Sequence, residues 1–198
     1  MNEVKKAASL ALIVLAVCLT VWAAPSTSRA DDLAQLPGGS KVDLAERCPV
    51  CGMVVGGDLG ATVAYSYRAN RPVGFAGVAA AVFKDGHVVG FEGARCLFIY
   101  SAVPKRFGIE VENISRRFVT DFNSRKMIDV TEAFLVLGSP VKGPMGYELI
   151  PFSTLEEAEK FQARFGGRRI VQLGTVAFKD VERKSPPLKE DPAPEPSK

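Results

Sequence analysis

The amino-acid sequence predicts an α+β fold of two similar halves, each with the element order strand, strand, helix, strand. Within AAVFKDGHVVGF, Asp85-Gly86 lies between two apolar runs, which is the strongest short hairpin signal in a sequence. The segment EGARCLFIYSAV follows, with Cys96, Tyr100 and Val103 at helical spacing. A second helical segment, TLEEAEKFQARF, is closed by two glycines and followed at once by the strand-like RIVQL.

Further strands are predicted in both halves. In the first half, about residues 45–113, ATVAYSYR alternates small or polar residues with larger apolar ones, which suits a strand over 61–68. In the second half, about residues 114–178, the strand-like runs are ISRRFVTDF (114–122), AFLVLGS (133–139) and RIVQL (169–173). The two halves together make one compact domain over residues 45–178.

A capping motif opens the helix of the second half. Ser153 followed by Glu156 has the spacing at which a hydroxyl and a carboxylate satisfy the first N–H groups of a helix. Ala158, Phe161 and Phe165 then recur at helical spacing and form an apolar face. These residues predict an amphipathic helix.

The first thirty residues have the parts of a secretory signal. Two lysines precede an apolar run over residues 7–24, and the tripeptide SRA offers a cleavage site after residue 30. An uncleaved anchor is a second interpretation, because the run is near the lower length limit of a membrane-spanning helix. Lipidation of Cys18 is a third. All three place residues 31–198 outside the cytoplasm, and we expect the periplasm.

Both flanks of the domain differ from it in composition. Residues 31–44 carry Pro and Gly without periodicity and are interpreted as a lead-in, whereas 179–198 has five prolines among charges and predicts a disordered tail. The formal net charge is +3, and removal of residues 1–30 leaves about +1. Such a charge gives no overall field that attracts nucleic acid, so we expect no nucleic-acid partner.

Three cysteines follow residue 30, and they raise three chemical interpretations. Cys48 and Cys51 lie in the segment CPVCGM, and Cys96 lies in the first predicted helix. Export favours closing neighbouring thiols into disulfides, but an odd number cannot be fully paired within one chain. The sulfur of CPVCGM therefore serves a redox disulfide, half of a zinc site, or a site for a softer metal.

The redox interpretation requires a helix that begins at the motif, because a helix N-terminus lowers the pKa of the first thiol. Gly52 follows the second cysteine directly, and two more glycines stand at 56 and 57. These glycines disfavour such a helix.

The zinc interpretation requires about four nitrogen or sulfur ligands. Cys48, Cys51, Cys96 and His87, the only histidine, would complete such a set. Cys96 stands at an apolar helix position, where a free cysteine packs well, and His87 stands beside a hairpin turn. Ordinary packing and solvation account for both.

A softer metal is the remaining interpretation, because thiolates and thioethers prefer Cu(I) to zinc. Met53 lies two residues after Cys51. Met145 lies in GPMGYE among turn-forming residues, so we expect it to be exposed at a loop tip. Both thioethers are candidate copper ligands.

The motifs CPVCGM, FEGARCLF, VTDF, LGSPVKGPMGYELIPF and AEKFQARFGG occur between about Cys48 and Leu173. In order and spacing they resemble the NosL family, accessory proteins of nitrous oxide reductase maturation. The resemblance implies an α+β fold of two ββαβ halves. It also implies an exported Cu(I) chaperone, not an enzyme, which delivers copper for the reductase's copper–sulfur centre beside a membrane-bound transporter.

The metal ligands that the resemblance implies are, in order of preference, Cys48, Met145, Met53 and Cys51. A carrier must release its metal, which favours few accessible ligands that are exchanged one at a time. We therefore expect two or three sulfurs that bridge CPVCGM and the loop at 143–146 and leave one side open. A zinc-binding interaction module and a thiol–disulfide oxidoreductase remain the alternatives, and attachment to a membrane remains open.

Overall fold

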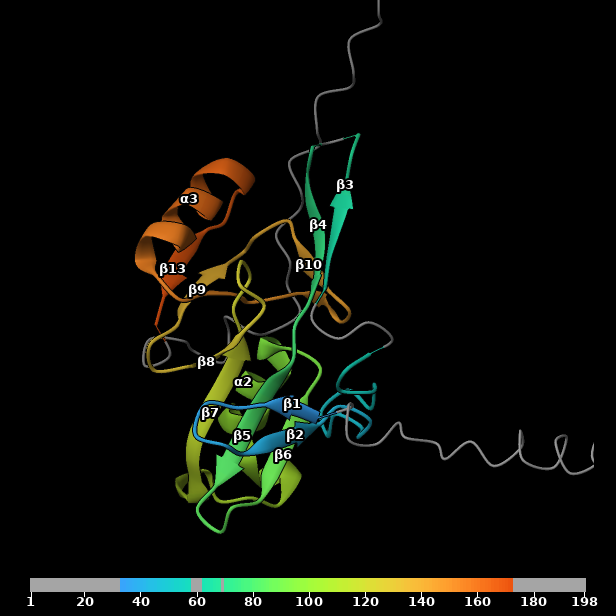
Figure 1. Ribbon diagram of the computed structural model, residues 1–198, viewed down its shortest axis with the longest axis vertical. Helices are drawn as coiled ribbons and strands as arrows, with labels where there is room; N and C mark the ends of the chain where they lie inside the picture. The colour runs from blue at the N-terminus through green and yellow to red at the C-terminus, as the bar shows by residue number, and fades with distance from the viewer. Residues whose placement is uncertain (1–32, 58–61, 69, 173–198) are drawn as a thin grey trace, which may run out of the picture. The chain divides into compact units, whose positions relative to one another are not determined.

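The computed structural model describes residues 33–57, 62–68 and 70–172 of the chain (Figure 1). The elements of the first part are β1 (Leu33–Gln35), β2 (Lys41–Asp43), β3 (Thr62–Ser66), β4 (Arg71–Ala76), β5 (Ala79–Phe83), β6 (Val88–Phe91), α2 (Ala94–Ala102) and the 3-10 helices η1 (Pro104–Phe107) and η2 (Val111–Asn113). Those of the second part are β7 (Ile114–Thr120), β8 (Met127–Asp129), β9 (Phe134–Leu137), β10 (Lys142–Gly143), β11 (Gly146–Tyr147), β12 (Ile150–Phe152), α3 (Leu155–Phe165) and β13 (Arg169–Val171). These elements confirm the predicted α+β class.

Two sheets of this part of the chain each carry a helix. In the sheet β6-β5-β7-β8, the central strand β5 pairs antiparallel with β6 and β7, and α2 packs against β5 and β6. In the sheet β12-β9-β13, β9 pairs antiparallel with β12 and β13, and α3 packs against all three strands (Figure 1). Along the chain, α2 connects β6 to β7 and α3 connects β12 to β13, so the order strand, strand, helix, strand occurs in both sheets.

The first helix and the hairpin before it lie where the sequence predicts them. The Asp85-Gly86 turn joins β5 to β6, and the Phe83 N–H donates to the His87 carbonyl at 2.8 Å. Helix α2 falls inside EGARCLFIYSAV and ends before Pro104. The predicted strands at 61–68, 114–122, 133–139 and 169–173 correspond to β3, β7, β9 and β13.

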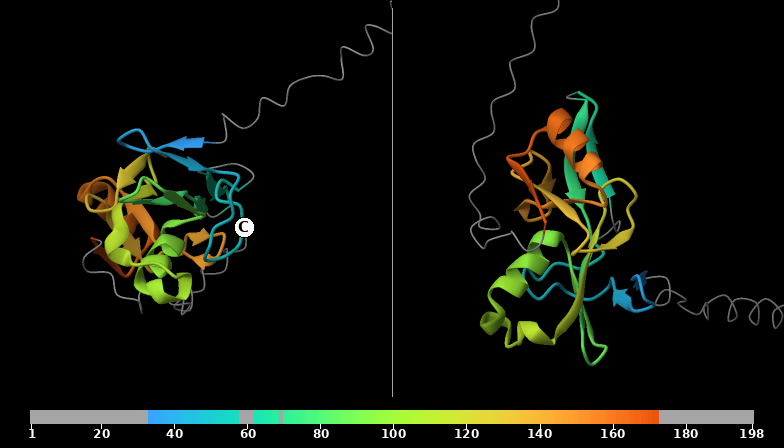
Figure 2. Two further views of the ribbon diagram at one scale, coloured as in Figure 1. Left: turned by 90° about the horizontal axis from the view of Figure 1, so that it is seen from below. Right: turned by 90° about the vertical axis from the view of Figure 1, so that its left-hand side faces the viewer.

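The residues expected to form a lead-in contain the hairpin β1–β2. Leu36 and Val42 are 1 % exposed and belong to the main core. Figure 2 shows this hairpin on one side of the sheet of β5, β6 and β7, with α2 on the other. Strands of three residues are too short to show alternation in the sequence, which is why this hairpin was not predicted.

The cap of α3 lies one residue later than predicted. Thr154, not Ser153, is the N-cap residue, and its hydroxyl accepts the Glu157 N–H at 3.3 Å. Ser153 instead donates to Asp121 and Glu157, while Glu156 pairs with Lys160 on the surface. The segment STLEE has two hydroxyls and two carboxylates three residues apart, so the spacing alone allows either register.

Two hydrophobic clusters hold the described part of the chain together. One contains Phe75, Phe122, Phe152 and Phe161, with neighbouring ring centroids 5.0–5.5 Å apart, and buries the Ala158 face of α3 as predicted. The larger cluster lies under α2 and includes Cys48 and Cys96 as well as apolar residues of both parts. The thiols therefore lie inside the main core.

The predicted signal segment (1–30) and the predicted tail (179–198) lie outside the described residues. Within 33–57, 62–68 and 70–172, no helix combines the length and the apolar character that crossing a membrane requires.

The observed cap predicts the effect of two substitutions in the first turn of α3. Thr154→Ala is expected to lower the free energy of unfolding by about 1 kcal/mol, because the Glu157 N–H loses its side-chain acceptor. Glu156→Ala should leave stability nearly unchanged, since its pair with Lys160 is on the surface. Urea unfolding measures the free energy of both variants. A larger loss of stability from the Glu156 substitution than from Thr154→Ala would support the predicted Ser153–Glu156 cap instead.

Candidate metal site

The segment CPVCGM forms the tip of a tight hairpin. The Cys48 N–H donates to the Met53 carbonyl at 2.8 Å, and the Cys48 carbonyl accepts the Gly52 N–H at 2.8 Å. Gly52 has φ +77°, a left-handed conformation that glycine adopts without steric cost. The Arg47 guanidinium donates to the Gly52 carbonyl at 2.8 Å. The motif is thus a turn and does not have the helix N-terminus of the redox interpretation.

Helix α2 brings a third thiol to this turn. Cys96 lies on the buried side of the helix and is 2 % exposed, and Cys48 is 1 % exposed. Cys51 is half-buried. The Sγ atoms of Cys48, Cys51 and Cys96 all lie within 4.8 Å of one another, and all three cysteines are free thiols. We call these three residues the thiol cluster.

The spacing of the thiol cluster suits a single metal ion. A metal–sulfur bond of about 2.3 Å places two ligating sulfurs about 4 Å apart. The observed upper limit of 4.8 Å requires a contraction of less than about 1 Å, which side-chain rotation can supply. The cluster could therefore hold one ion among three sulfurs without a rearrangement of the backbone.

Hydrogen bonding inside the cluster separates the pKa values of the thiols. The Cys96 thiol donates to Cys48 and lowers the pKa of Cys48 to about 5, although burial opposes this. Burial and the negative charge of Cys48 raise the pKa of Cys51 to about 11. The same hydrogen bond, together with burial, raises the pKa of Cys96. The cluster therefore carries one thiolate near neutral pH, which is the form of cysteine that binds metals.

Two buried carboxyl groups lie next to the cluster. The Cys51 thiol donates to Glu92 Oε2 at 3.9 Å. Burial, with the charges of Glu148 and Cys48, raises the pKa of Glu92 to about 8, and burial raises the pKa of Glu148 to about 7. Glu92 is thus an oxygen donor within reach of the thiols, and it lies in a region that already disfavours negative charge.

The methionines predicted as ligands take different positions. Met145 lies in the two-residue turn between β10 and β11, where Gly143 pairs with Gly146. It is half-buried and packs against the core cluster that contains Cys48 and Cys96, so its expected exposure at a loop tip is wrong. The apolar core beside the turn accounts for the difference. Met53 is half-buried and joins the CPVCGM turn through its carbonyl.

The fourth member of the predicted zinc set does not reach the cluster. His87 is exposed in the β5–β6 turn, where its ring lies 5.8 Å from that of Phe83, centroid to centroid. Among the described residues, the group of three potential metal ligands contains cysteines alone. The structure thus joins three residues of that set and separates the fourth.

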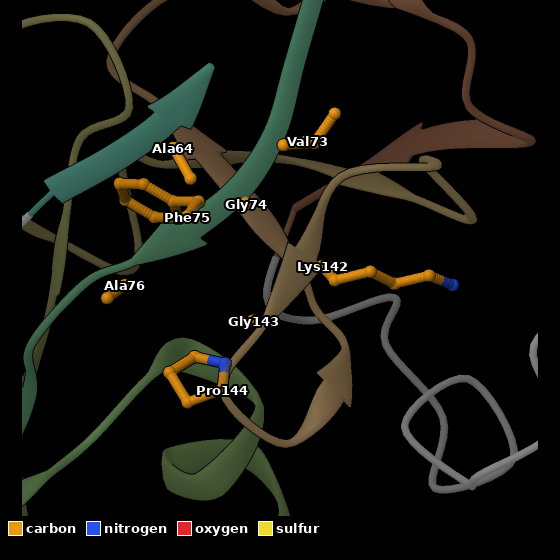
Figure 3. A pocket seen from close by; sticks show the side chains of 8 residues that line it. All are labelled: Ala64, Val73, Gly74, Phe75, Ala76, Lys142, Gly143 and Pro144. Carbon is orange, nitrogen blue, oxygen red and sulfur yellow. The ribbon is translucent and has the colours of Figure 1, made fainter. Parts of the chain in front are cut away.

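An apolar hollow of about 330 Å³ lies beside the Met145 turn. Its lining carries the ammonium group of Lys142 and no sulfur, as Figure 3 shows; the residues are Ala64, Val73, Gly74, Phe75, Ala76, Lys142, Gly143 and Pro144. The hollow is therefore separate from the thiol cluster.

Sequence reasoning did not identify every residue of the site. Cys96 was considered for zinc and then attributed to ordinary packing, because a buried free cysteine and a buried ligand produce the same pattern. Glu92 and Glu148 lie in the motifs FEGARCLF and LGSPVKGPMGYELIPF, but no chemical role was assigned to either residue. The signal that could have identified Glu92 is its place directly after a strand and before the helix that carries Cys96.

The fold and the thiol cluster define an α+β protein with three cysteines that could bind a metal ion. The sequence profile of the NosL family matches residues 40–184. The chain belongs to the NosL family, as its motifs indicated.

One solved structure shows the same fold, and a second is similar to part of the chain. The crystal structure of the copper chaperone NosL from Shewanella denitrificans matches with a TM-score of 0.55 and 21 % identity, over 73 % of this chain and 99 % of that one. The solution structure of the apo-NosL protein from Achromobacter cycloclastes matches with a TM-score of 0.40 and 22 % identity, over 57 % of this chain and 93 % of that one. No curated protein matches the sequence.

Removal of the third thiol tests the hydrogen bond inside the cluster. Cys96→Ala is expected to raise the pKa of Cys48 from about 5 toward the usual value of about 8.5, because the thiolate loses its donor. Thiolate absorbance across a pH titration of the reduced, metal-free protein measures this shift. An unchanged pKa of Cys48 would show that Cys96 does not stabilise the thiolate.

The raised pKa of Glu92 predicts a pH-dependent effect of its neutralisation. The pKa is about 8 in the fold and 4.5 when unperturbed, so the unfolded chain releases this proton at lower pH than the fold does. Glu92 therefore makes the fold less stable as pH rises from about 5 to 8. Glu92→Gln should gain stability relative to the unsubstituted protein over that interval.

Urea unfolding of both proteins, reduced with a phosphine, at pH 5 and pH 8 measures this difference. If the advantage of Glu92→Gln over the unsubstituted protein stays constant or shrinks between pH 5 and pH 8, Glu92 does not have a raised pKa in the fold.

Proposed function

We propose that this protein is a Cu(I) chaperone that carries copper for assembly of the copper–sulfur centre of nitrous oxide reductase. The observation that carries the proposal is the convergence of three free thiols, from two segments 45 residues apart, within 4.8 Å in the core. Membership of the NosL family supports it, and so does the fold shared with a protein described as a copper chaperone.

The chemistry of the donors favours Cu(I). Three thiols are soft ligands, and soft ligands prefer a soft cation of low charge. A buried site also favours an ion of low charge, because the raised pKa values of Cys51 and Cys96 oppose the further thiolates that a divalent ion needs for neutrality.

Zinc is the second candidate, on one observation. Glu92 Oε2 lies 3.9 Å from Cys51 Sγ and would supply a fourth, harder ligand beside the three sulfurs. In that case the domain would be a zinc-stabilised interaction module.

Release of copper follows from the unequal burial of the thiols. Cys48 and Cys96 are buried, whereas Cys51 is half-buried and so is the sulfur that an acceptor reaches first. Exchange of ligands then proceeds from Cys51 inward, with Met53 and Met145 as the predicted thioether ligands. No bond of a substrate is made or broken in this transfer, so the proposed activity is not enzymatic.

The proposal includes the cellular setting and the internal symmetry inferred from the sequence. The chaperone acts in the periplasm, beside a membrane-bound maturation transporter, after export by the segment 1–30. We also interpret the domain as two ββαβ halves. The shared strand orders β6-β5-β7 and β12-β9-β13, each with a helix before its last strand, support that interpretation.

Loss of individual ligands tests the proposal. Cys48→Ser and Met145→Ala are each expected to weaken Cu(I) binding at least about tenfold, which is about 1.4 kcal/mol, because each removes a sulfur donor. His87→Ala is the matched control, since His87 is exposed and outside the thiol cluster. Competition with a chromogenic Cu(I) chelator measures the affinities.

The copper proposal fails if both variants bind Cu(I) as tightly as the unsubstituted protein. Zinc that copurifies with the protein, and raises its unfolding temperature more than Cu(I) does, would support the zinc module instead.

A further inference from the structure

Two buried charged residues connect the Met145 turn to helix α2. Glu148 follows β11 and is 3 % exposed, and Arg95 precedes Cys96 in α2 and is 4 % exposed. They are 53 residues apart in the sequence. One residue of this Arg95–Glu148 pair is thus adjacent to a thiol of the cluster, and the other is three residues from Met145.

Glu148 caps helix α2 from a distant part of the chain. The N-cap residue Gly93 has no side chain to accept the first N–H groups of the helix, which have no acceptor within it. Glu148 Oε1 accepts the Arg95 N–H at 2.8 Å and also the Leu149 N–H at 2.9 Å. The bond to Arg95 is the one that a local capping side chain would make.

Arg95 makes the reciprocal connection. Its guanidinium Nη1 donates to the Met145 carbonyl at 3.3 Å and to the Tyr147 carbonyl at 3.5 Å. The carbonyl of the predicted thioether ligand is therefore bonded to the residue next to Cys96. Arg95 and Glu148 thus each connect the start of α2 to the segment 145–148.

Two glycines leave the space that Glu148 occupies. A Cβ added at Gly93 would lie 2.7 Å from Glu148 Oε2, and one added at Gly143 would lie closer still. These contacts involve the carboxylate itself, whose position is already set by two backbone donors. The Glu148 carboxylate therefore fits closely between Gly93 and Gly143, and a larger residue at either position would displace it.

We propose that Arg95 and Glu148 are positioning residues that hold Met145 against the thiol cluster before the metal arrives. This inference rests on the proposed function, because it takes Met145 as a copper ligand. Residues that orient metal ligands typically change affinity 10- to 100-fold when they are replaced. The pair acts through Met145, so its effect on metal binding depends on the thioether.

A double-mutant cycle tests that dependence. Arg95→Lys keeps the positive charge opposite Glu148 but removes the guanidinium that bonds the two carbonyls. It is expected to weaken Cu(I) binding about tenfold, and to cause no further weakening in protein that already carries Met145→Ala. Competition with a chromogenic Cu(I) chelator gives the four affinities.

Asp121→Asn is the matched control. Asp121 is fully buried and accepts backbone N–H groups of Asn123, Ser124 and Ser153, so it is comparable to Glu148 in burial and bonding. The variant should lower stability and leave Cu(I) affinity within about twofold. Glu148→Gln is the second variant if Arg95→Lys does not fold, with the same expectation as Arg95→Lys.

A metal-free measurement separates this inference from the copper proposal. The ¹³C-methyl NMR signal of Met145 is assigned by its loss in Met145→Ala. Relaxation of this signal should give a lower methyl order parameter, and so a more mobile side chain, in Arg95→Lys than in the unsubstituted protein. If the protein does not bind Cu(I), the proposed function fails, but this signal still decides whether the pair orders Met145.

The inference is overturned if Arg95→Lys weakens Cu(I) binding equally with and without Met145, or if it leaves both affinity and the Met145 methyl signal unchanged. It is also overturned if Asp121→Asn produces the same Met145-dependent loss, because reduced stability would then explain the effect.

Discussion

The Cys96 thiol donates a hydrogen bond to the sulfur of Cys48, and this contact joins the CPVCGM turn to helix α2 inside the main core. It requires the turn at 48–53 and the first turn of α2 to meet, although more than forty residues separate them. In the metal-free protein it also favours the thiolate at Cys48, while the pKa values of Cys51 and Cys96 are raised. Binding of one metal ion by all three sulfurs therefore releases the protons of Cys51 and Cys96, because the thiolate is the form that ligates.

The contacts around the cluster shield its sulfur and connect the segments that carry it. A site made of surface thiols would expose its sulfur to oxidation, whereas here Cys48 and Cys96 are buried and Cys51 is half-buried. Glu92 stands behind Cys51, and the Arg95–Glu148 pair joins the helix to the Met145 turn. Buried polar groups of this kind are stable only when their bonds are satisfied, so they tie the ligand segments together.

Much of the fold could be predicted from the sequence, because long periodic segments and strong turn signals dominate it. The Asp85-Gly86 hairpin and both helices illustrate this. Strands of two or three residues, such as β10 and β11, carry no readable pattern. The position of the Met145 turn depends on tertiary bonds from Arg95, which no local pattern indicates. Cys48 and Cys51 were recognised by spacing, but Cys96 has the pattern of an ordinary core residue until its neighbours are known.

The central claim is that three thiols from two segments bind one copper ion. X-ray absorption at the copper edge of the Cu(I)-loaded protein tests it most directly, with Cys96→Ala measured beside it. The account predicts a first shell of sulfur alone, with one sulfur fewer in the Cys96 variant. A shell that contains nitrogen or oxygen, or a sulfur number that does not change without Cys96, would contradict it.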